Sequence, residues 1–245
     1  MKNFCLAVNT VSTSRDLWKM FFGQLEKHYP GNKVYVFTDE ADGMPAGCEV
    51  VRYDPRDNFR TQYLKCLKSV KEDFIMNFNE DYILYGDVDR DAVGEYVSLL
   101  SKDDSISFIR FTRGSNFTPS RYGNREDLFY LDNRAEYFYS QTVAIWKKPV
   151  LEKIHEIGPD LHIAGKRTKL QFEVEANKVC ARIDIKGLVS YRKEPKRGLV
   201  HYDSSVVPYI ASALVKGKWN LGEYEKELGP ILAEYGIDYG ARGRV

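Results

Sequence analysis

The chain has 245 residues, with the ordinary apolar and charged content of a globular protein and a formal net charge of +1. This length is enough for one substantial core, and a nearly neutral chain gives no electrostatic reason to bind nucleic acid or an anionic membrane. No apolar run is long enough to span a bilayer, and the four cysteines are too widely spaced for a disulfide framework or a zinc site, so we expect a cytoplasmic protein.

The first half of the chain alternates between predicted strands and helices. An amphipathic helix that ends at Pro30 separates the first two strands, and this spacing predicts a βαβ unit with parallel strands. Two further amphipathic helices each follow a strand. The predicted strands are 3–8, 33–38, 48–53 and the apolar run 74–79, followed by the apolar segment 82–85, and the later helices are 61–70 and 90–101.

The second half is less regular. Residues 112–134 are polar and lack a clear period, so we expect a long loop that is mobile without ligand and borders an acceptor site. Around it the sequence predicts strands at 106–111, 144–146, 179–185 and 187–191, a helix at 149–157 and a short helix at 170–177. From Ser204 the tail shows helical patterns that Gly217 and Gly229-Pro230 interrupt. No repeat or linker divides the chain, which predicts a single domain over residues 1–245.

Two adjacent acids, Glu80 and Asp81, follow the apolar run at 74–79. Open α/β sheets bind ligands at the carboxyl ends of such strands. Two carboxylates supply the hard oxygen donors that suit Mg²⁺ or Mn²⁺ carrying phosphates. The simpler alternative is a cap, or an ion pair with a nearby Lys or Arg.

A literal DxD motif follows at Asp87-Val88-Asp89. It stands directly before a predicted amphipathic helix, where aspartate is a favoured N-cap and suits the helix dipole. We therefore interpret Asp87 and Asp89 as capping residues and prefer Glu80 and Asp81 as the metal-binding acids.

Other polar residues are weaker candidates. Glu173 could be a general base, which must lie within hydrogen-bond reach of the hydroxyl it deprotonates, although surface pairing with Lys169 or Lys178 is the simpler alternative. His201 is the one histidine that we place near a site, against the commoner surface or core role. Basic residues that could clamp a diphosphate, or be ordinary solvated surface, are Arg192, Lys193, Lys196, Arg197, Lys216, Lys218, Arg242 and Arg244.

Several short blocks resemble small glycosyltransferases of the GT-A fold from bacteria and large DNA viruses. The blocks are scattered over most of the chain, and Leu170-Gln171 departs from a Pro-Trp pair in that pattern. The similar segments are Glu80-Asp81-Tyr82, residues 140–148, Phe172-Glu173, residues 201–205, residues 217–220, residues 235–238 and Arg242-Gly243.

The resemblance implies a GT-A-like α/β fold, that is, a Rossmann-like nucleotide-binding mixed sheet flanked by helices, with a helical tail from about residue 204. It implies transfer of a sugar from a nucleotide-diphosphate donor, preferably a UDP-sugar, to a glycan hydroxyl with Mn²⁺ or Mg²⁺. Asp81 takes the role of the last acid in a DxD-like motif. Glu80 and His201 are assigned as further metal ligands, and Glu173 as the base of an inverting reaction.

The donor side of the predicted site follows the first two strands. Asn9, Thr10 and Thr13 are expected to face the nucleoside and Asp39 its ribose or base, while cations such as Arg192 and Lys218 face the diphosphate. Two alternatives stay open at this point. One is a sugar-phosphate nucleotidyltransferase, although its Gly-rich first loop with a lysine is absent; the other is a non-catalytic domain that binds nucleotides or glycans.

Overall fold

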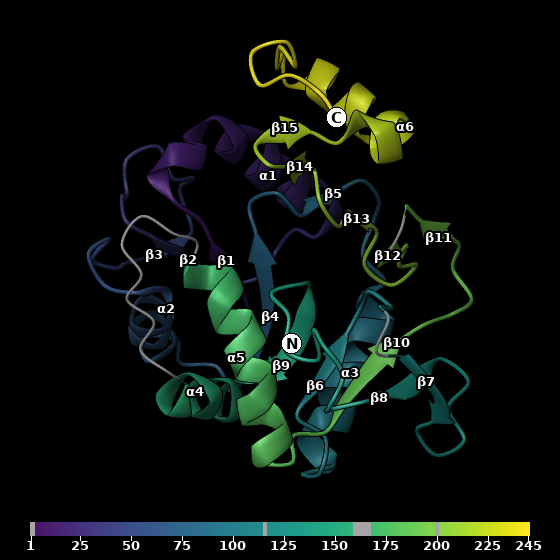
Figure 1. Cartoon of the computed structure of the whole chain (residues 1–245). Coiled ribbons are helices and arrows are strands. Elements are labelled where there is room, and N and C mark those ends of the chain that lie inside the picture. Colours follow the sequence, from purple (N-terminus) through teal and green to yellow (C-terminus); the bar gives the residue numbers. More distant parts are fainter. Residues whose placement is uncertain (1–2, 115–116, 159–167, 199–200) are drawn as a thin grey trace.

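The computed structural model describes residues 3–114, 117–158, 168–198 and 201–245. Within them, one mixed sheet of nine strands forms the centre of the molecule (Figure 1). Its strands are β1 (Phe4–Asn9), β2 (Val34–Thr38), β3 (Glu49–Arg52), β4 (Phe74–Asn79), β6 (Phe108–Arg110), β7 (Phe117–Arg121), β8 (Leu128–Leu131), β9 (Ala144–Lys147) and β10 (Gly187–Ser190).

The strand order is β3-β2-β1-β4-β9-β6-β10-β8-β7. The first four strands are parallel, and β1 pairs with β2 through the register Leu6↔Val34, which confirms the predicted βαβ unit. Strand β9 runs antiparallel to both β4 and β6, and β10 is parallel to β6. The strands β4, β6 and β10 therefore all end at the same edge of the sheet as β1 and β2.

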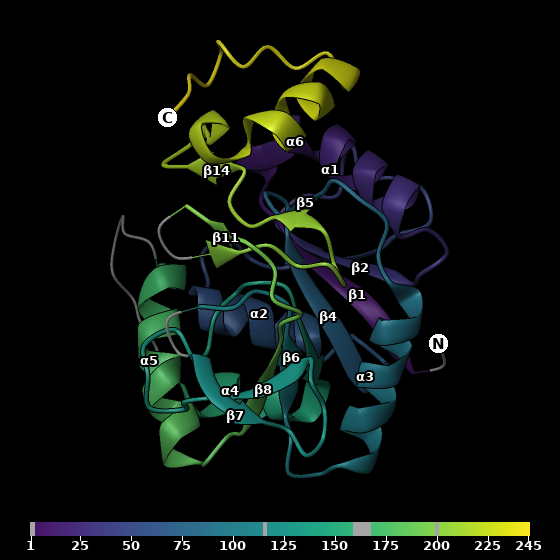
Figure 2. The same cartoon turned by 90° about the vertical axis from the view of Figure 1, so that its right-hand side faces the viewer.

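Helices cover both faces of the sheet (Figure 2). Alternate residues of each strand point to opposite faces, so in β1 Leu6 and Val8 pack on one side while Cys5 and Ala7 pack on the other. Helices α1 (Arg15–His28) and α3 (Arg90–Lys102) cover the first face. The second face is covered by α2 (Phe59–Leu67), α4 (Lys148–Ile157) and α5 (Thr168–Arg182). This arrangement confirms the predicted fold, a Rossmann-like α/β mixed sheet flanked by helices.

The C-terminal segment lies beyond the carboxyl ends of the central strands (Figure 1). Its helix α6 (Leu221–Glu234) packs against α1 through a third apolar cluster that includes Leu17, Trp219 and Leu228. The short strands here are β13 (Tyr209–Ile210), which pairs with β5 (Ile83–Leu84), and the hairpin β14 (Leu214–Val215) with β15 (Lys218–Trp219). Two further short strands, β11 (Lys196–Arg197) and β12 (His201–Tyr202), pair with each other.

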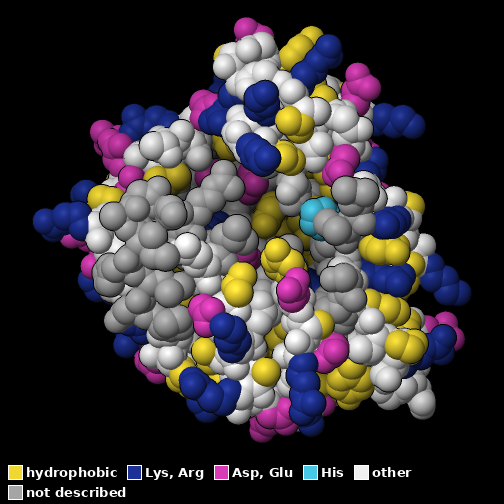
Figure 3. Space-filling model, in the orientation of Figure 1, with side chains coloured by type: hydrophobic (Ala, Val, Ile, Leu, Met, Phe, Trp, Pro, Cys, Tyr) yellow, Lys and Arg dark blue, Asp and Glu magenta, His cyan; other side chains and the backbone are white. Residues whose placement is uncertain are grey.

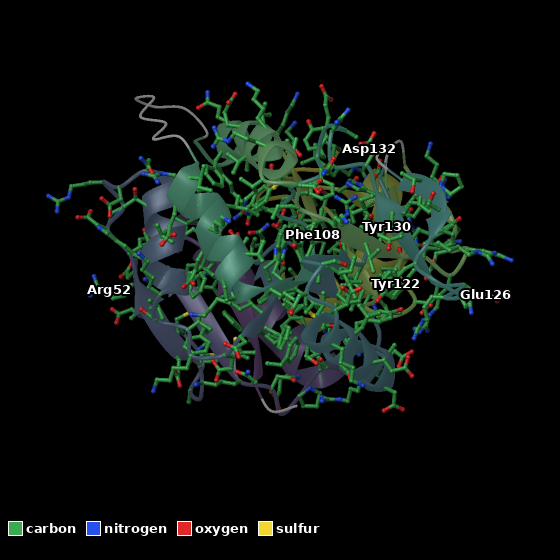
Figure 4. The ribbon with its side chains drawn as sticks, turned by 90° about the horizontal axis from the view of Figure 1, so that it is seen from below. Arg52, Phe108, Tyr122, Glu126, Tyr130 and Asp132 are labelled. Atoms are coloured by element: carbon green, nitrogen blue, oxygen red, sulfur yellow. The ribbon has the colours of Figure 1, made fainter. Side chains whose placement is uncertain are left out.

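Two predictions of secondary structure before the C-terminal tail are wrong. The predicted loop 112–134 contains the hairpin β7–β8, in which the rings of Tyr122 and Tyr130 lie 6.1 Å apart at the edge of the sheet remote from Arg52 (Figure 4). The predicted strand 179–185 is mostly the end of α5, because Phe172, Ala176 and Cys180 form one buried helical face.

The tail departs from its prediction as well. Gly217 forms the turn of the hairpin β14–β15 with φ +81°, where the sequence predicts an interrupted helix. Pro230 lies inside α6, so Gly229-Pro230 does not end that helix, while the non-helical residue within it is Tyr224. In the part of the chain that the structure describes, no helix has both the length and the apolar character needed to cross a membrane.

Candidate functional site

The candidate site lies at the edge where β1, β2 and β4 end. Asn9 is the last residue of β1 and is level with Asn79, the last residue of β4. Thr38 ends β2 on the other side of β1 and is followed by Asp39. The space-filling view shows a hollow in this face between the C-terminal segment and the lower part of the sheet (Figure 3). The parallel strands thus bring the predicted donor-side residues and the two acids to one edge.

The Asp81 carboxyl group is desolvated although part of the residue stays exposed. Burial and the neighbouring Glu80 carboxylate raise the pKa of Asp81 to about 7, against a lowering contribution from the Lys169 ammonium. Its backbone carbonyl accepts a hydrogen bond from the Ala213 amide at 3.1 Å, which fixes the turn after β4 to the C-terminal segment. An acid with a strongly raised pKa beside a second acid is a typical feature of a functional site.

Glu173 reaches the same edge from the first turns of α5. One of its carboxylate oxygens accepts a hydrogen bond of 2.6 Å from the Gln141 amide. Burial raises the pKa of Glu173, and the contributions of this hydrogen bond and of Lys169 oppose that shift. A half-buried carboxylate with a raised pKa suits proton abstraction near neutral pH.

A hydrogen-bond network connects Glu173 with the end of β4, two residues before Asp81. The Lys169 ammonium donates to the Asn79 side-chain oxygen at 2.7 Å, and the Asn79 amide donates to the Gln141 carbonyl at 3.2 Å. Because Gln141 also holds Glu173, the end of β4 and the start of α5 are fixed relative to each other. Lys169 lowers the pKa of both Asp81 and Glu173, so its positive charge lies near both carboxylates.

The donor-side residues differ in how accessible they are. Asp39 accepts hydrogen bonds of 2.7 Å from the Ser12 amide and hydroxyl; burial opposes ionisation, but these bonds outweigh it and lower the pKa of Asp39. Thr10 is buried, and its hydroxyl accepts from the Trp18 indole at 2.8 Å. Asn9 is half-buried, whereas Thr13 is exposed in the 3-10 turn η1 (Ser12–Ser14).

The two predicted phosphate-binding cations differ in their surroundings. Arg192 forms an ion pair of 3.0 Å with Asp89 at the start of α3, and Lys218 is exposed in β15. Asp89 also accepts from the Ala92 amide at 3.0 Å, which confirms its predicted role as an N-cap. Asp87 does not cap the helix but is exposed and contacts the His28 ring at 2.8 Å.

His201 is not assembled with the acids as a metal ligand. Burial lowers the pKa of His201, and the charges that act on it are those of Glu223 and Arg110 rather than Asp81 or Glu80. Across the residues described, no group of three or more His, Cys, Asp or Glu side chains is placed to hold a metal. The acids at the end of β4 therefore offer a pair of carboxylates, and not a complete set of protein ligands.

The sequence does not predict the contact between Lys169 and Asn79, whereas Arg242 is among the basic residues that it offers for a diphosphate. Lys169 was considered only as a surface partner of Glu173, although its position before Phe172-Glu173 was a signal. Arg242, near the C-terminus, forms an ion pair with Asp16 in α1, and the charge of Glu80 helps to raise the pKa of its guanidinium. A second cation within electrostatic reach of the acids, besides Lys169, therefore comes from the last residues of the chain.

No protein-family model and no curated protein matches the sequence. Among solved structures, a CMP:2-keto-3-deoxy-manno-octonic acid synthetase complexed with CTP has a TM-score of 0.49 and 11% identity, covering 77% of this chain and 89% of that chain. A cytidylyltransferase from Leptospira borgpetersenii has a TM-score of 0.49 and 15% identity over 97% of both chains. The structure of S. aureus TarS residues 1–349 has a TM-score of 0.49 and 12% identity, covering 82% of this chain and 60% of that chain.

Proposed function

We propose that the protein is a metal-dependent glycosyltransferase that moves a sugar from a nucleotide-diphosphate donor, preferably a UDP-sugar, to a glycan hydroxyl with inversion. The observation that supports this most is the convergence of Asp81 and Glu173 on Lys169 at the carboxyl end of β4. Asp81 lies beside the Glu80 carboxylate, and such a pair suits the binding of a metal cation. Glu173 is held by a backbone amide and suits the uptake of a proton. Sugar transfer from a nucleotide diphosphate needs both functions.

Asp81 and Glu80 fit the metal that this reaction implies. Both offer only oxygen donors, and Mg²⁺ in phosphate-transferring sites is commonly held by one or two carboxylates with the substrate phosphates completing its shell. When bound there, Mn²⁺ or Mg²⁺ supplies positive charge that stabilises the departing diphosphate. Arg242, whose guanidinium is close enough to feel the Glu80 charge, adds a second positive group on the same side.

The donor's nucleoside is assigned to the ends of β1 and β2. Asp39 is ionised and rigidly held by Ser12, so it can accept hydrogen bonds from ribose hydroxyls or a base. Asn9 is half-buried beside it and offers an amide group. The buried Thr10 has a supporting role, since its hydroxyl holds Trp18 and its carbonyl accepts from the Tyr53 hydroxyl at 2.9 Å.

Glu173 is assigned as the base. It takes the proton from the acceptor hydroxyl as that oxygen forms a bond to the anomeric carbon, and the bond from that carbon to the diphosphate oxygen breaks on the opposite side. Desolvation strengthens the carboxylate as a base, and the Gln141 amide keeps it oriented. The Lys169 ammonium lowers the pKa of both Asp81 and Glu173 and so favours their ionised forms against the effect of burial.

A product screen tests this function. The protein is incubated with Mn²⁺ and UDP-, GDP- or dTDP-sugars together with mixed oligosaccharides, and released nucleoside diphosphate and new glycosides are measured. We expect one donor to give both products, with an inverted anomeric configuration by NMR. Parallel reactions hold a nucleoside triphosphate and sugar phosphates. Formation of a nucleotide sugar and pyrophosphate in those reactions, without glycoside in the first set, would refute the proposal in favour of nucleotidyl transfer.

A further inference from the structure

A cavity of about 360 Å³ lies along α5, next to Glu173 but outside the site described above. It is formed between one face of α5, from Val174 to Ala181, and the chain segment from Arg134 to Tyr137. The helix rises by about 10 Å between Val174 and Ala181. The volume is within the range of small-molecule pockets. The cavity therefore offers room for a ligand that continues away from the base.

Hydrogen bonds connect the lining of the cavity to the residue assigned as the base. Asn177 lines it, accepts a hydrogen bond of 2.8 Å from the Tyr139 amide, and donates one of 2.8 Å to the Glu173 carbonyl one helical turn earlier. Two residues after Tyr139, the Gln141 amide holds the Glu173 carboxylate. The segment 137–141 thus runs along α5 from the cavity lining to Glu173, and Val174 in the lining directly follows Glu173 in the helix.

The cavity lining includes Tyr137, whose backbone adopts an unfavourable conformation. The Tyr137 residue is 49% exposed, and its backbone has φ +58°, which is unfavourable for a bulky side chain. The guanidinium of Arg110, itself buried, donates to the Tyr137 carbonyl at 2.8 Å and supports this conformation. Backbone conformations of this kind gather at ligand sites, where the surrounding structure maintains them.

The other lining groups complement a sugar. Val174 is 48% exposed and adds apolar surface beside the tyrosine ring. Arg134, Glu136 and Lys178 provide both donors and acceptors at the rim, and Lys178 is already paired with Glu175 at 2.7 Å. A flat apolar and aromatic surface bordered by mixed polar groups matches a neutral sugar ring, which has apolar faces and a rim of hydroxyls.

We propose that this cavity is a distal acceptor subsite, which binds a sugar unit of an extended glycan whose reacting hydroxyl lies at Glu173. The inference rests on the proposed function and specifies its acceptor: an oligosaccharide rather than a monosaccharide. The ring of Tyr137 stacks on the distal sugar, and the apolar surface of Val174 contacts the same unit. Chain length is then recognised by a pocket that takes no part in the chemical step.

The test uses gluco-, manno-, galacto- and chito-oligosaccharides of one to six units as acceptors. For the wild type we expect KM to fall at least tenfold between the monosaccharide and the oligosaccharide that reaches the cavity, equivalent to about 1.4 kcal/mol. Tyr137→Ala should lose this gain while kcat and KM for the monosaccharide stay unchanged, and Tyr137→Phe should keep it. Val174→Arg, which fills the cavity from the helix surface, should behave as Tyr137→Ala does.

The control is Tyr239→Ala, which removes a tyrosine that is 52% exposed in the C-terminal tail. It should keep the wild-type dependence on chain length. An equal fall in KM with acceptor length in wild type, Tyr137→Ala and Val174→Arg would overturn the subsite. A wild-type KM that does not depend on acceptor length would overturn it as well.

Direct binding separates this inference from the proposed function. Saturation-transfer NMR of the same oligosaccharides without donor should show contact of the distal unit in wild type and its loss in Tyr137→Ala. A protein that binds oligosaccharides in this way but transfers no sugar would refute the glycosyltransferase and support sugar binding in the cavity without a role as an acceptor subsite. Transfer that proceeds with no Tyr137-dependent binding would refute the subsite alone.

Discussion

Glu173→Gln is the substitution that separates the base from the rest of the site. The amide oxygen of glutamine can still accept the 2.6 Å hydrogen bond from Gln141, so the side chain keeps its position but cannot take up a proton. We expect the transfer rate to fall by about 10² or more, which corresponds to a barrier higher by about 2.7 kcal/mol. Donor affinity should change little, because the group acts on the acceptor.

The same substitution has a predictable effect on stability. Burial raises the pKa of Glu173 in the folded state, so at neutral pH its ionised form opposes folding; the neutral glutamine should leave the melting temperature unchanged or higher. The matched control is Glu175→Gln on the same helix, whose side chain pairs with Lys178 on the surface and which should retain full activity. The assay compares single-turnover transfer rates, donor affinity and melting temperature. Normal turnover by Glu173→Gln, or a product that retains configuration, would refute the assignment.

Three further predictions concern the fold. Asp89→Ala should lower the free energy of unfolding by about 1 kcal/mol through loss of the N-cap, while Asp87→Ala should change it by less than about 0.5 kcal/mol; equal losses in urea titrations would contradict this. Burial lowers the pKa of His155 to about 3, whereas in the unfolded chain it titrates near its ordinary value of about 6.5. The free energy of unfolding should therefore be unaffected by His155 above about pH 6.5 and fall by about 1.4 kcal/mol per pH unit from there toward pH 3. Denaturation of His155→Gln at a series of pH values should lack this slope. Gly187→Ala should destabilise by about 1 to 3 kcal/mol, because its new methyl group would meet the Phe108 ring at 2.2 Å; an unchanged denaturation midpoint would show that this ring can move.

The sequence predicted the edge where the first strands end because that edge depends on local pattern. Short buried strands followed by polar residues indicate where a parallel sheet ends, and this was enough to bring Asp39 and Asp81 to one edge. Asp89 was identified as a cap from its place before an amphipathic helix, and the structure confirms that role. These inferences needed only the period of apolar residues and the rule that parallel strands share an edge.

Other features depended on contacts between distant segments. Lys169 and Asn79 are 90 residues apart, and no spacing rule connects them. The charge of Glu80 acts on Arg242, which lies far along the chain. Arg242 comes near because the residues after α6 turn back and lie beside β15, where Arg244 pairs with Trp219. The hairpin β7–β8 was missed because Phe117–Arg121 is an edge strand with exposed polar residues, so it has no alternating apolar pattern.

The measurement that tests the central claim most directly is the Mn²⁺-dependent stabilisation of the protein by a UDP-sugar. Ligand at 100 times its Kd stabilises the folded state by about 2.7 kcal/mol, which for a chain of this size raises the melting temperature by roughly 5 to 10 °C. The account predicts this shift in wild type and in Asp89→Asn, and its loss in Asp81→Asn with the unliganded melting temperature preserved. A full shift in Asp81→Asn, or its loss in Asp89→Asn, would contradict the metal-dependent site at the end of β4.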